Sequence, residues 1–164
     1  MINRSKVLCI IDHPTQYDPP IWRYMQQTEI EPVVIYLSAT KKLVDPETGM
    51  EVAWHGVPAF RDACTFPNKT AAVREWFDEQ NSYEAVILPG YRHPVCREVL
   101  WTAKKRKIPT ILPTDAINEI GFNRKHAKQL IAKPIHKVGA KLFDGFWTTG
   151  LLGVEYLSDL GVPK

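Results

Sequence analysis

The sequence lacks the short motifs that identify many nucleotide-binding and hydrolytic proteins. It contains no G-x-G-x-x-G after the first apolar run, no G-x-x-x-x-G-K-[ST] and no G-x-S-x-G. These absences exclude the usual dinucleotide fingerprint, the P-loop and the common hydrolase elbow. Any chemistry must therefore come from polar residues in the loops between secondary-structure elements.

Metal-binding and disulfide patterns are also missing. No two histidines are spaced i, i+4, so the sequence gives no reason to expect a zinc site, and we expect no metal requirement. The three cysteines, Cys9, Cys64 and Cys96, are odd in number and have no C-x-x-C spacing. This usage is typical of buried thiols in a reducing compartment, so the expected location is the cytoplasm.

Long apolar runs and a strong charge bias are absent too. No run approaches the roughly 18–20 apolar residues of a membrane span, and the N-terminal run ends at Asp12, too early for a signal peptide. The net charge of +3 is too small to indicate nucleic-acid binding. The 164 residues, 45% of them hydrophobic and 24% charged, fit one globular domain.

The sequence does contain a regular alternation of short apolar runs and amphipathic segments. Because strands and helices that alternate at this spacing form parallel sheets, we predict an α/β fold. Helices would cover both faces of a Rossmann-like open sheet that spans residues 1–164, with strand order 3-2-1-4-5. The predicted strands are Val7–Ile11, Pro32–Leu37, Ala85–Leu88, Thr110–Leu112 and Phe143–Trp147.

The helices between these strands are predicted from capping residues and apolar spacing. Asp18 and Pro19 favour a helix start, and this helix runs to about Gln27. Another follows Asn68, and between Leu37 and that helix Ser38–Pro67 is predicted as a long loop with a short edge strand at Met50–Trp54. Two further helices should bury Cys96, Val99, Leu100 and Ala103, and Val154, Leu157 and Leu160, the second ending at Gly161.

Polar residues follow the carboxyl ends of several predicted strands. These ends meet at one edge of a parallel sheet, where α/β proteins bind their ligands. Each of these residues could instead serve as a cap, a turn or a partner for backbone groups, and the sequence leaves both interpretations open. The candidate binding residues are Asp12, Thr15, Gln16, Tyr17, Gly90, Tyr91, Arg92, Thr114, Thr149 and Gly150, with His13 and Asp115 as candidate catalytic groups.

Different chemistry is expected at each loop. His13 could bond a hydroxyl or a phosphate of a ligand, while Gly90 would let a ligand approach the backbone. Arg92 could meet an anionic group. Thr149 and Gly150 open the last predicted helix, whose N-terminal amides could face a phosphate.

A basic segment lies between Glu119 and Asp144. It holds six Lys or Arg residues and no acid, whereas acidic residues outnumber basic ones in the remainder of the chain. An apolar stripe ends at Val138, so the segment is predicted as a basic amphipathic helix kinked at Pro134. Such a helix could contact an anionic membrane surface, or its apolar side could pack on the sheet. The basic residues are Arg124, Lys125, Lys128, Lys133, Lys137 and Lys141.

Several stretches resemble retaining GT-B glycosyltransferases of family four. H-P-T-Q-Y-D-P-P-I-W-R after the first strand is similar to their H-P-x-Q-Y-x-x-P-x-x-R opening, and Gly90-Tyr91 resembles the G-Y or G-W after their third strand. The closing T-G-L-L-G-V-E-Y-L-S-D-L-G-V-P resembles the end of their N-terminal domain. Asp45, Gly49, Trp54 and Pro58 resemble a D-x-x-x-G…W-D-x-P stretch, with His55 in place of Asp.

The resemblance implies the acceptor-binding, N-terminal domain of an enzyme that moves a sugar from a nucleotide-sugar donor to a hydroxyl. The C-terminal, donor-binding domain with its pair of glutamates is expected in cis or in trans, and without it the chain should be inactive. The implied acceptor is a carbohydrate or a lipid-linked molecule. A lipid-linked acceptor would bring peripheral contact at the inner membrane surface through the basic segment.

Two alternatives come from other functional classes. The chain could be a freestanding sugar- or nucleotide-binding module, or a split subunit that pairs with a separate donor-domain chain. A flavodoxin-like receiver domain would need an acidic cluster after the first strand and a lysine after the fifth. The sequence instead has a single Asp12 and Thr148-Thr149-Gly150, which argues against a receiver.

Overall fold

A parallel β-sheet organises the residues that the computed structural model describes, which are 4–12, 18–37, 43–44, 51–52, 64–65, 77, 83–114, 137–148 and 150–163. Six strands form this sheet: β1 (Ser5–Ile11), β2 (Ile30–Tyr36), β5 (Cys64–Thr65), β6 (Ala85–Ile87), β7 (Thr110–Thr114) and β8 (Gly145–Thr148). They pair in the order β5-β2-β1-β6-β7-β8, and each pairing is parallel. A separate antiparallel pair joins β3 (Leu43–Val44) to β4 (Glu51–Val52).

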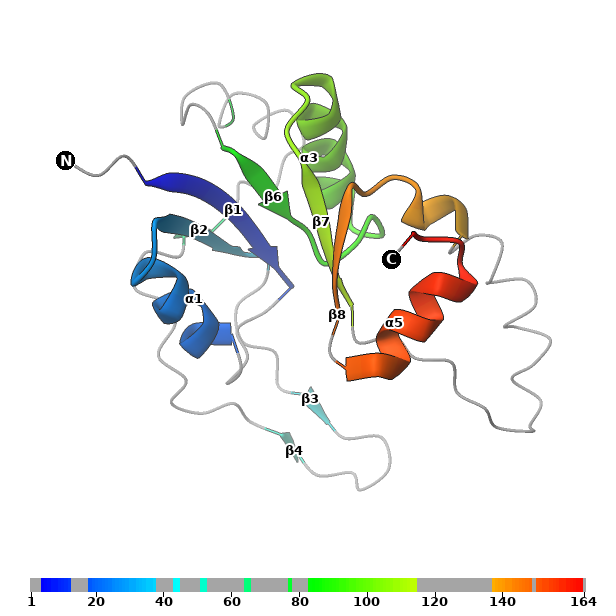
Figure 1. The fold of residues 1–164 in the computed structure, drawn as a ribbon. Helices are drawn as coiled ribbons and strands as arrows, with labels where there is room; N and C mark the ends of the chain where they lie inside the picture. The colour runs from blue at the N-terminus through cyan, green and yellow to red at the C-terminus, as the bar shows by residue number, and fades with distance from the viewer. Residues whose placement is uncertain are drawn as a thin grey trace.

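Helices lie on both faces of the sheet, as predicted. The helices in the described part of the chain are α1 (Asp18–Gln26), α3 (Pro94–Lys105) and α5 (Gly150–Asp159), and residues 137–140 form a further helical turn. Figure 1 shows α1 beside β1 and β2, and α5 beside β8 at the other end of the sheet. The α/β class is therefore confirmed.

The central strand β1 is buried on both sides. Its alternate residues Val7 and Cys9 pack with Trp22 of α1, whereas Leu8 and Ile10 pack in the cluster that contains the inner face of α3. Successive side chains of a strand point to opposite faces, so one short apolar run supplies both halves of the core. The predicted inward stripe of α3, Cys96, Val99, Leu100 and Ala103, is buried throughout.

The predicted strand order needs one correction. Counted in chain order, the six strands run 3-2-1-4-5-6, the order of doubly wound Rossmann sheets. The prediction gave the third position to Ala85–Leu88, which is wrong because β6 pairs with β1 and β7. That outer position belongs to β5, whose two residues are too few to show a strand pattern and were predicted as loop.

Two inward-facing predictions in the C-terminal part are also wrong. Val138 is 66% exposed although it was placed on an apolar stripe, and the neighbouring Gly139 and Ala140 are buried instead. Val154 is 37% exposed, whereas Leu157 and Leu160 are buried and Gly161 ends α5 with φ of +81°, as predicted. Of the predicted helix after Asn68, only Phe77 lies among the described residues, where it is helical and buried.

Asp144 joins three elements at the amino end of β8. Its Oδ2 accepts hydrogen bonds from the amide and the hydroxyl of Thr110 at 2.8 and 2.9 Å, and its Oδ1 accepts one from Lys104 Nζ at 2.7 Å. Partial burial raises the pKa of Asp144, but the bonds from Lys104 and Thr110 outweigh it, and the net pKa is below the ordinary value. The carboxylate thus fastens β8 to β7 and to the last turn of α3.

We expect Asp144→Asn to destabilise the fold by about 1 kcal/mol at pH 7, a modest value because half of the side chain is exposed to solvent. A depressed folded-state pKa contributes stability above the unfolded value of 3.8 that is lost as the pH falls through the folded pKa. The wild-type protein and Asp144→Asn should therefore differ less in their free energy of unfolding, measured with denaturant, as the pH falls below about 5. The exposed Glu29→Gln, with the same charge change, is the control and should cause no such loss.

Candidate functional site

A hollow of about 470 Å³ opens where the strands β1, β6 and β7 end. Asp12 follows β1, Gly90–Arg92 follow β6, and Thr114 is the last residue of β7. Further parts of the wall come from the first turn of α3, from residues 139–140, from Phe146 of β8 and from the inner face of α5. We call this hollow the carboxyl-edge pocket, because the carboxyl ends of the parallel strands lead into it.

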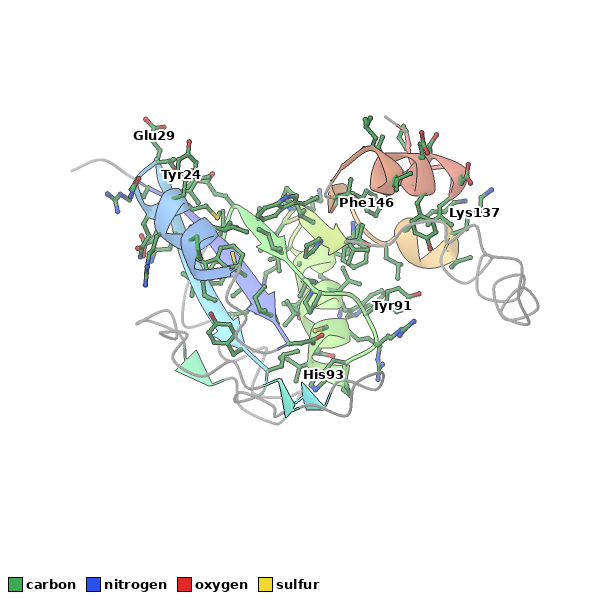
Figure 2. All side chains as sticks on the ribbon, turned by 90° about the horizontal axis from the view of Figure 1, so that it is seen from below. Tyr24, Glu29, Tyr91, His93, Lys137 and Phe146 are labelled. Atoms are coloured by element: carbon green, nitrogen blue, oxygen red, sulfur yellow. The ribbon has the colours of Figure 1, made fainter. Side chains whose placement is uncertain are left out.

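Tyr91 lies in the pocket in close contact with Gly139. A Cβ added to Gly139 would lie 2.7 Å from Tyr91 Cζ and closer still to its hydroxyl, so the ring rests directly on the glycine. The loop backbone is fixed as well, because Arg97 Nη1 donates to the carbonyls of Arg92 at 2.8 Å and Tyr91 at 3.4 Å. Figure 2 shows Tyr91 on the side of α3 that faces the 137–140 turn. The ring is therefore placed by its contact with Gly139, and its backbone by the bonds from Arg97.

The first turn of α3 forms the floor beside Asp12. His93 is its N-cap, and its Nδ1 accepts the Val95 amide at 3.3 Å. Cys96 is fully buried and lines the pocket, and burial together with the negative charge of Asp12 raises the pKa of its thiol to about 12, against a lowering effect of Arg97. Cys96 thus remains a thiol at neutral pH and is a poor nucleophile.

Tyr156 extends the polar part of the pocket from α5. Burial raises the pKa of its phenol, and the neighbouring Tyr91 raises it further. The group therefore stays protonated at neutral pH and can donate a hydrogen bond as well as accept one. With Tyr91 it places two phenols from distant parts of the sequence in one pocket.

The structure brings together five of the predicted site residues: Asp12, Gly90, Tyr91, Arg92 and Thr114. Gly90 has φ of +136°, which favours glycine, and Arg92 is exposed at the rim. Gly150 begins α5 with φ of +76° but does not line the pocket. The predicted residues outside the described part of the chain are His13, Thr15, Gln16, Tyr17, Asp115 and Thr149, and they remain predictions.

Sequence reasoning missed several lining residues. Tyr156 was not chosen because the predicted stripe of α5 began at Val154, whereas the buried face runs through Gly153 and Leu157. A helical stripe that started at Gly153 would have included position 156, since i, i+3 and i+4 share one face. Gly139 and Phe146 gave no comparable signal, because their place in the pocket depends on how distant elements pack.

The surroundings of the pocket leave other expectations open. In the described ranges no group of three or more His, Cys, Asp or Glu side chains could hold a metal ion, and the metal requirement stays untested. Among the described helices, none has the length and hydropathy of a membrane span. Of the basic segment only Lys137 and Lys141 lie in the described part, both exposed, so contact with a membrane surface remains a prediction.

Comparisons with protein-family models, curated proteins and solved structures find no match to this chain. The function must therefore be argued from the pocket and from the motifs in the sequence.

We expect Gly139→Ala to destabilise the protein by about 1–3 kcal/mol, because the new methyl group would overlap the Tyr91 ring. In an unobstructed helical turn the same change would stabilise the protein by about 0.5–1 kcal/mol. A loss of stability in place of this gain would therefore identify the contact between residue 139 and the Tyr91 ring. Gly145→Ala is the control, since its Cβ would make an ordinary 3.7 Å contact with Ile111. Replacing the ring with the shorter leucine side chain (Tyr91→Leu) in the Gly139→Ala background should restore stability, measured by urea unfolding.

We expect Cys9 and Cys96 to resist thiol reagents in the native protein. Both are buried and burial raises each pKa to about 12, so at pH 8 only about one thiol in ten thousand would be ionised. The measurement is titration with a chromogenic disulfide in a Cys64→Ser background, with the urea-unfolded chain as the control. Rapid native labelling of either thiol would contradict the packing described for β1 and α3.

Proposed function

We propose that this chain is the acceptor-binding domain of a GT-B glycosyltransferase that transfers a sugar from a nucleotide-sugar to a hydroxyl. One observation carries the proposal. Two of the stretches that resemble the family, Gly90-Tyr91 and the E-Y-L-S-D-L-G-V-P end, lie far apart in the sequence yet supply Tyr91 and Tyr156 to the same pocket. Asp12, directly before the H-P-T-Q-Y stretch, lines that pocket as well.

The position of the pocket supports the same proposal. It opens at the carboxyl edge of a parallel sheet with doubly wound order, where proteins of this architecture bind ligands. A domain that holds the acceptor needs hydrogen-bonding groups that fix one hydroxyl toward the donor, because orientation lowers the entropic part of the barrier. The pocket offers a carboxylate that can accept hydrogen bonds, from Asp12, and two hydroxyl groups, from Thr114 and Tyr156.

In the proposed division of roles, this chain orients the acceptor and a second domain holds the nucleotide-sugar. His13 and Asp115 remain the proposed catalytic groups, adjoining Asp12 and Thr114 in the sequence. Preorganised groups in the cleft would stabilise the charge that develops as the donor's bond to phosphate breaks. The configuration at the anomeric carbon would be retained, as the family resemblance implies.

A freestanding binding module is the alternative, and it would use the same pocket without transfer. The coding sequence after Lys164, or a neighbouring reading frame, separates the two: a donor domain with a pair of glutamates supports the transferase. Incubated alone with nucleotide-sugars and glycosides, the 164-residue chain should give no steady transfer, whereas addition of that donor domain should produce it. Steady transfer by this chain alone would refute its assignment as the acceptor half.

We expect Asp12→Asn to weaken the binding of hydroxyl-bearing acceptors about tenfold or more. A hydrogen bond to a charged group contributes about 1.5–3 kcal/mol, and about 1.4 kcal/mol corresponds to tenfold. Titration of the isotopically labelled chain with methyl glycosides, followed by NMR, gives the affinities and shows whether Gly90 and Thr114 respond. Asp159→Asn on the exposed side of α5 is the control and should leave the affinities unchanged.

A further inference from the structure

The described wall of the carboxyl-edge pocket has two chemically different parts. The polar part holds Asp12, Tyr91, Arg92, Thr114 and Tyr156. The apolar part comes from β7, β8, the 137–140 turn and α5 with the residue that follows it, and includes Leu112, Ala140, Phe146, Leu157 and Leu160. Figure 2 shows Phe146 on the α5 side of the sheet, apart from His93 at the start of α3.

The apolar part is preformed. Ala140, Leu157 and Leu160 are each less than 8% exposed, so they are held by packing and are not free to turn toward solvent. The hollow of about 470 Å³ is roughly three times the ~150 Å³ cavity that holds one benzene ring. There is room for a sugar ring and for a second, apolar ring beside it.

The start of α3 is a poor site for a phosphate. Pro94 has no N–H to offer, and the Val95 amide already donates to Nδ1 of His93. Two of the N-terminal donors that usually bind an anion are thus missing or occupied. The described lining carries one basic side chain that is always charged, Arg92, and Asp12 opposes it with a negative charge.

The two phenols suit an uncharged ligand. Tyr91 is held by Gly139 and by the Arg97 bonds to its loop, and Tyr156 approaches it from α5. Phenols of this kind bond hydroxyl groups, and their ring faces pack against apolar ligand surface. Two neighbouring phenols select for shape and hydroxyl pattern more than for charge.

We propose that the acceptor taken by this pocket is an uncharged amphipathic glycoside: a hydroxyl-bearing sugar attached to an apolar aryl or alkyl group. The sugar lies against Asp12, Thr114 and the two phenols, and the apolar group lies against Phe146, Leu157 and Leu160. This inference rests on the proposed function and adds the acceptor class to it. The same inference excludes a nucleoside diphosphate as the preferred ligand of this pocket.

The experiment uses the 164-residue chain and matched ligand pairs, the methyl and the phenyl glycosides of several hexoses, with the hexose 1-phosphates and UDP as charged competitors. Affinities come from calorimetry and the location of binding from NMR shifts of Gly90, Tyr91 and Thr114. We expect the phenyl glycoside of the preferred sugar to bind about tenfold more tightly than its methyl counterpart. Raising the salt from 50 to 500 mM should change its affinity less than twofold.

Variants separate the two parts of the pocket. Phe146→Leu should reduce the advantage of the phenyl glycoside by about threefold or more and leave the methyl glycoside nearly unchanged. Trp147→Leu is the control, because the next residue of β8 points to the opposite face and does not line the pocket. Tyr156→Phe should weaken both glycosides equally, by about threefold or more, whereas Tyr24→Phe on α1 should weaken neither.

The outcomes distinguish this inference from the proposed function. If glycosides bind at the pocket without an advantage for the phenyl group, or if a hexose phosphate or UDP binds more tightly, the acceptor class is wrong and the sugar-binding domain stands. If no glycoside shifts the pocket residues, both the acceptor class and the proposed function fail. A phenyl advantage that is insensitive to salt and reduced by Phe146→Leu supports the inference.

Discussion

The burial of β1 on both faces is the constraint on which the rest of the structure depends. A strand enclosed by α1 on one side and α3 on the other can satisfy its backbone groups only through neighbouring strands, and it pairs with β2 and β6. Both pairings are parallel, and the same direction extends to β7 and β8. The described strands of this sheet therefore end at the same edge, where Asp12, Gly90–Arg92 and Thr114 line one pocket.

The amino and carboxyl edges of the sheet differ, because the first is held by hydrogen bonds and the second opens into the pocket. At the amino end of β8, Asp144 is bonded by Lys104 and Thr110, which fastens the outer strand to its neighbours. At the carboxyl edge the same strand carries Phe146 to the pocket wall and leads into α5. The bonds to Asp144 at the amino edge of the sheet thus hold β8 and α3 in position, and both of these elements line the pocket at the carboxyl edge. Tyr91 on Gly139 is the corresponding contact within the pocket, since it connects the loop after β6 to the 137–140 turn.

Local patterns were sufficient for the fold class and for most described elements. Val7–Ile11, the Pro94 helix start and Gly161 as a helix end were all recognisable, because burial, proline and glycine act through nearest neighbours in the chain. The same reasoning failed for β5, where two residues carry no period, and for Val138 and Val154, which were placed on apolar helical stripes but are exposed. Apolar side chains are common on protein surfaces, so hydrophobicity is a weak guide near the ends of a helix.

The sequence by itself determined that strands and helices would alternate and that Asp12 and Gly90–Arg92 would follow strand ends, because alternation and polarity are properties of the chain read in order. Thr114 was expected just after a strand and is instead the last residue of β7. Only the tertiary structure decided which of these residues share a pocket, and that Tyr156, Phe146 and Gly139 complete it. The reason is physical: the contact between Tyr91 and Gly139 joins positions 48 residues apart, and no local preference specifies a contact that exists only after the helices have packed on the sheet.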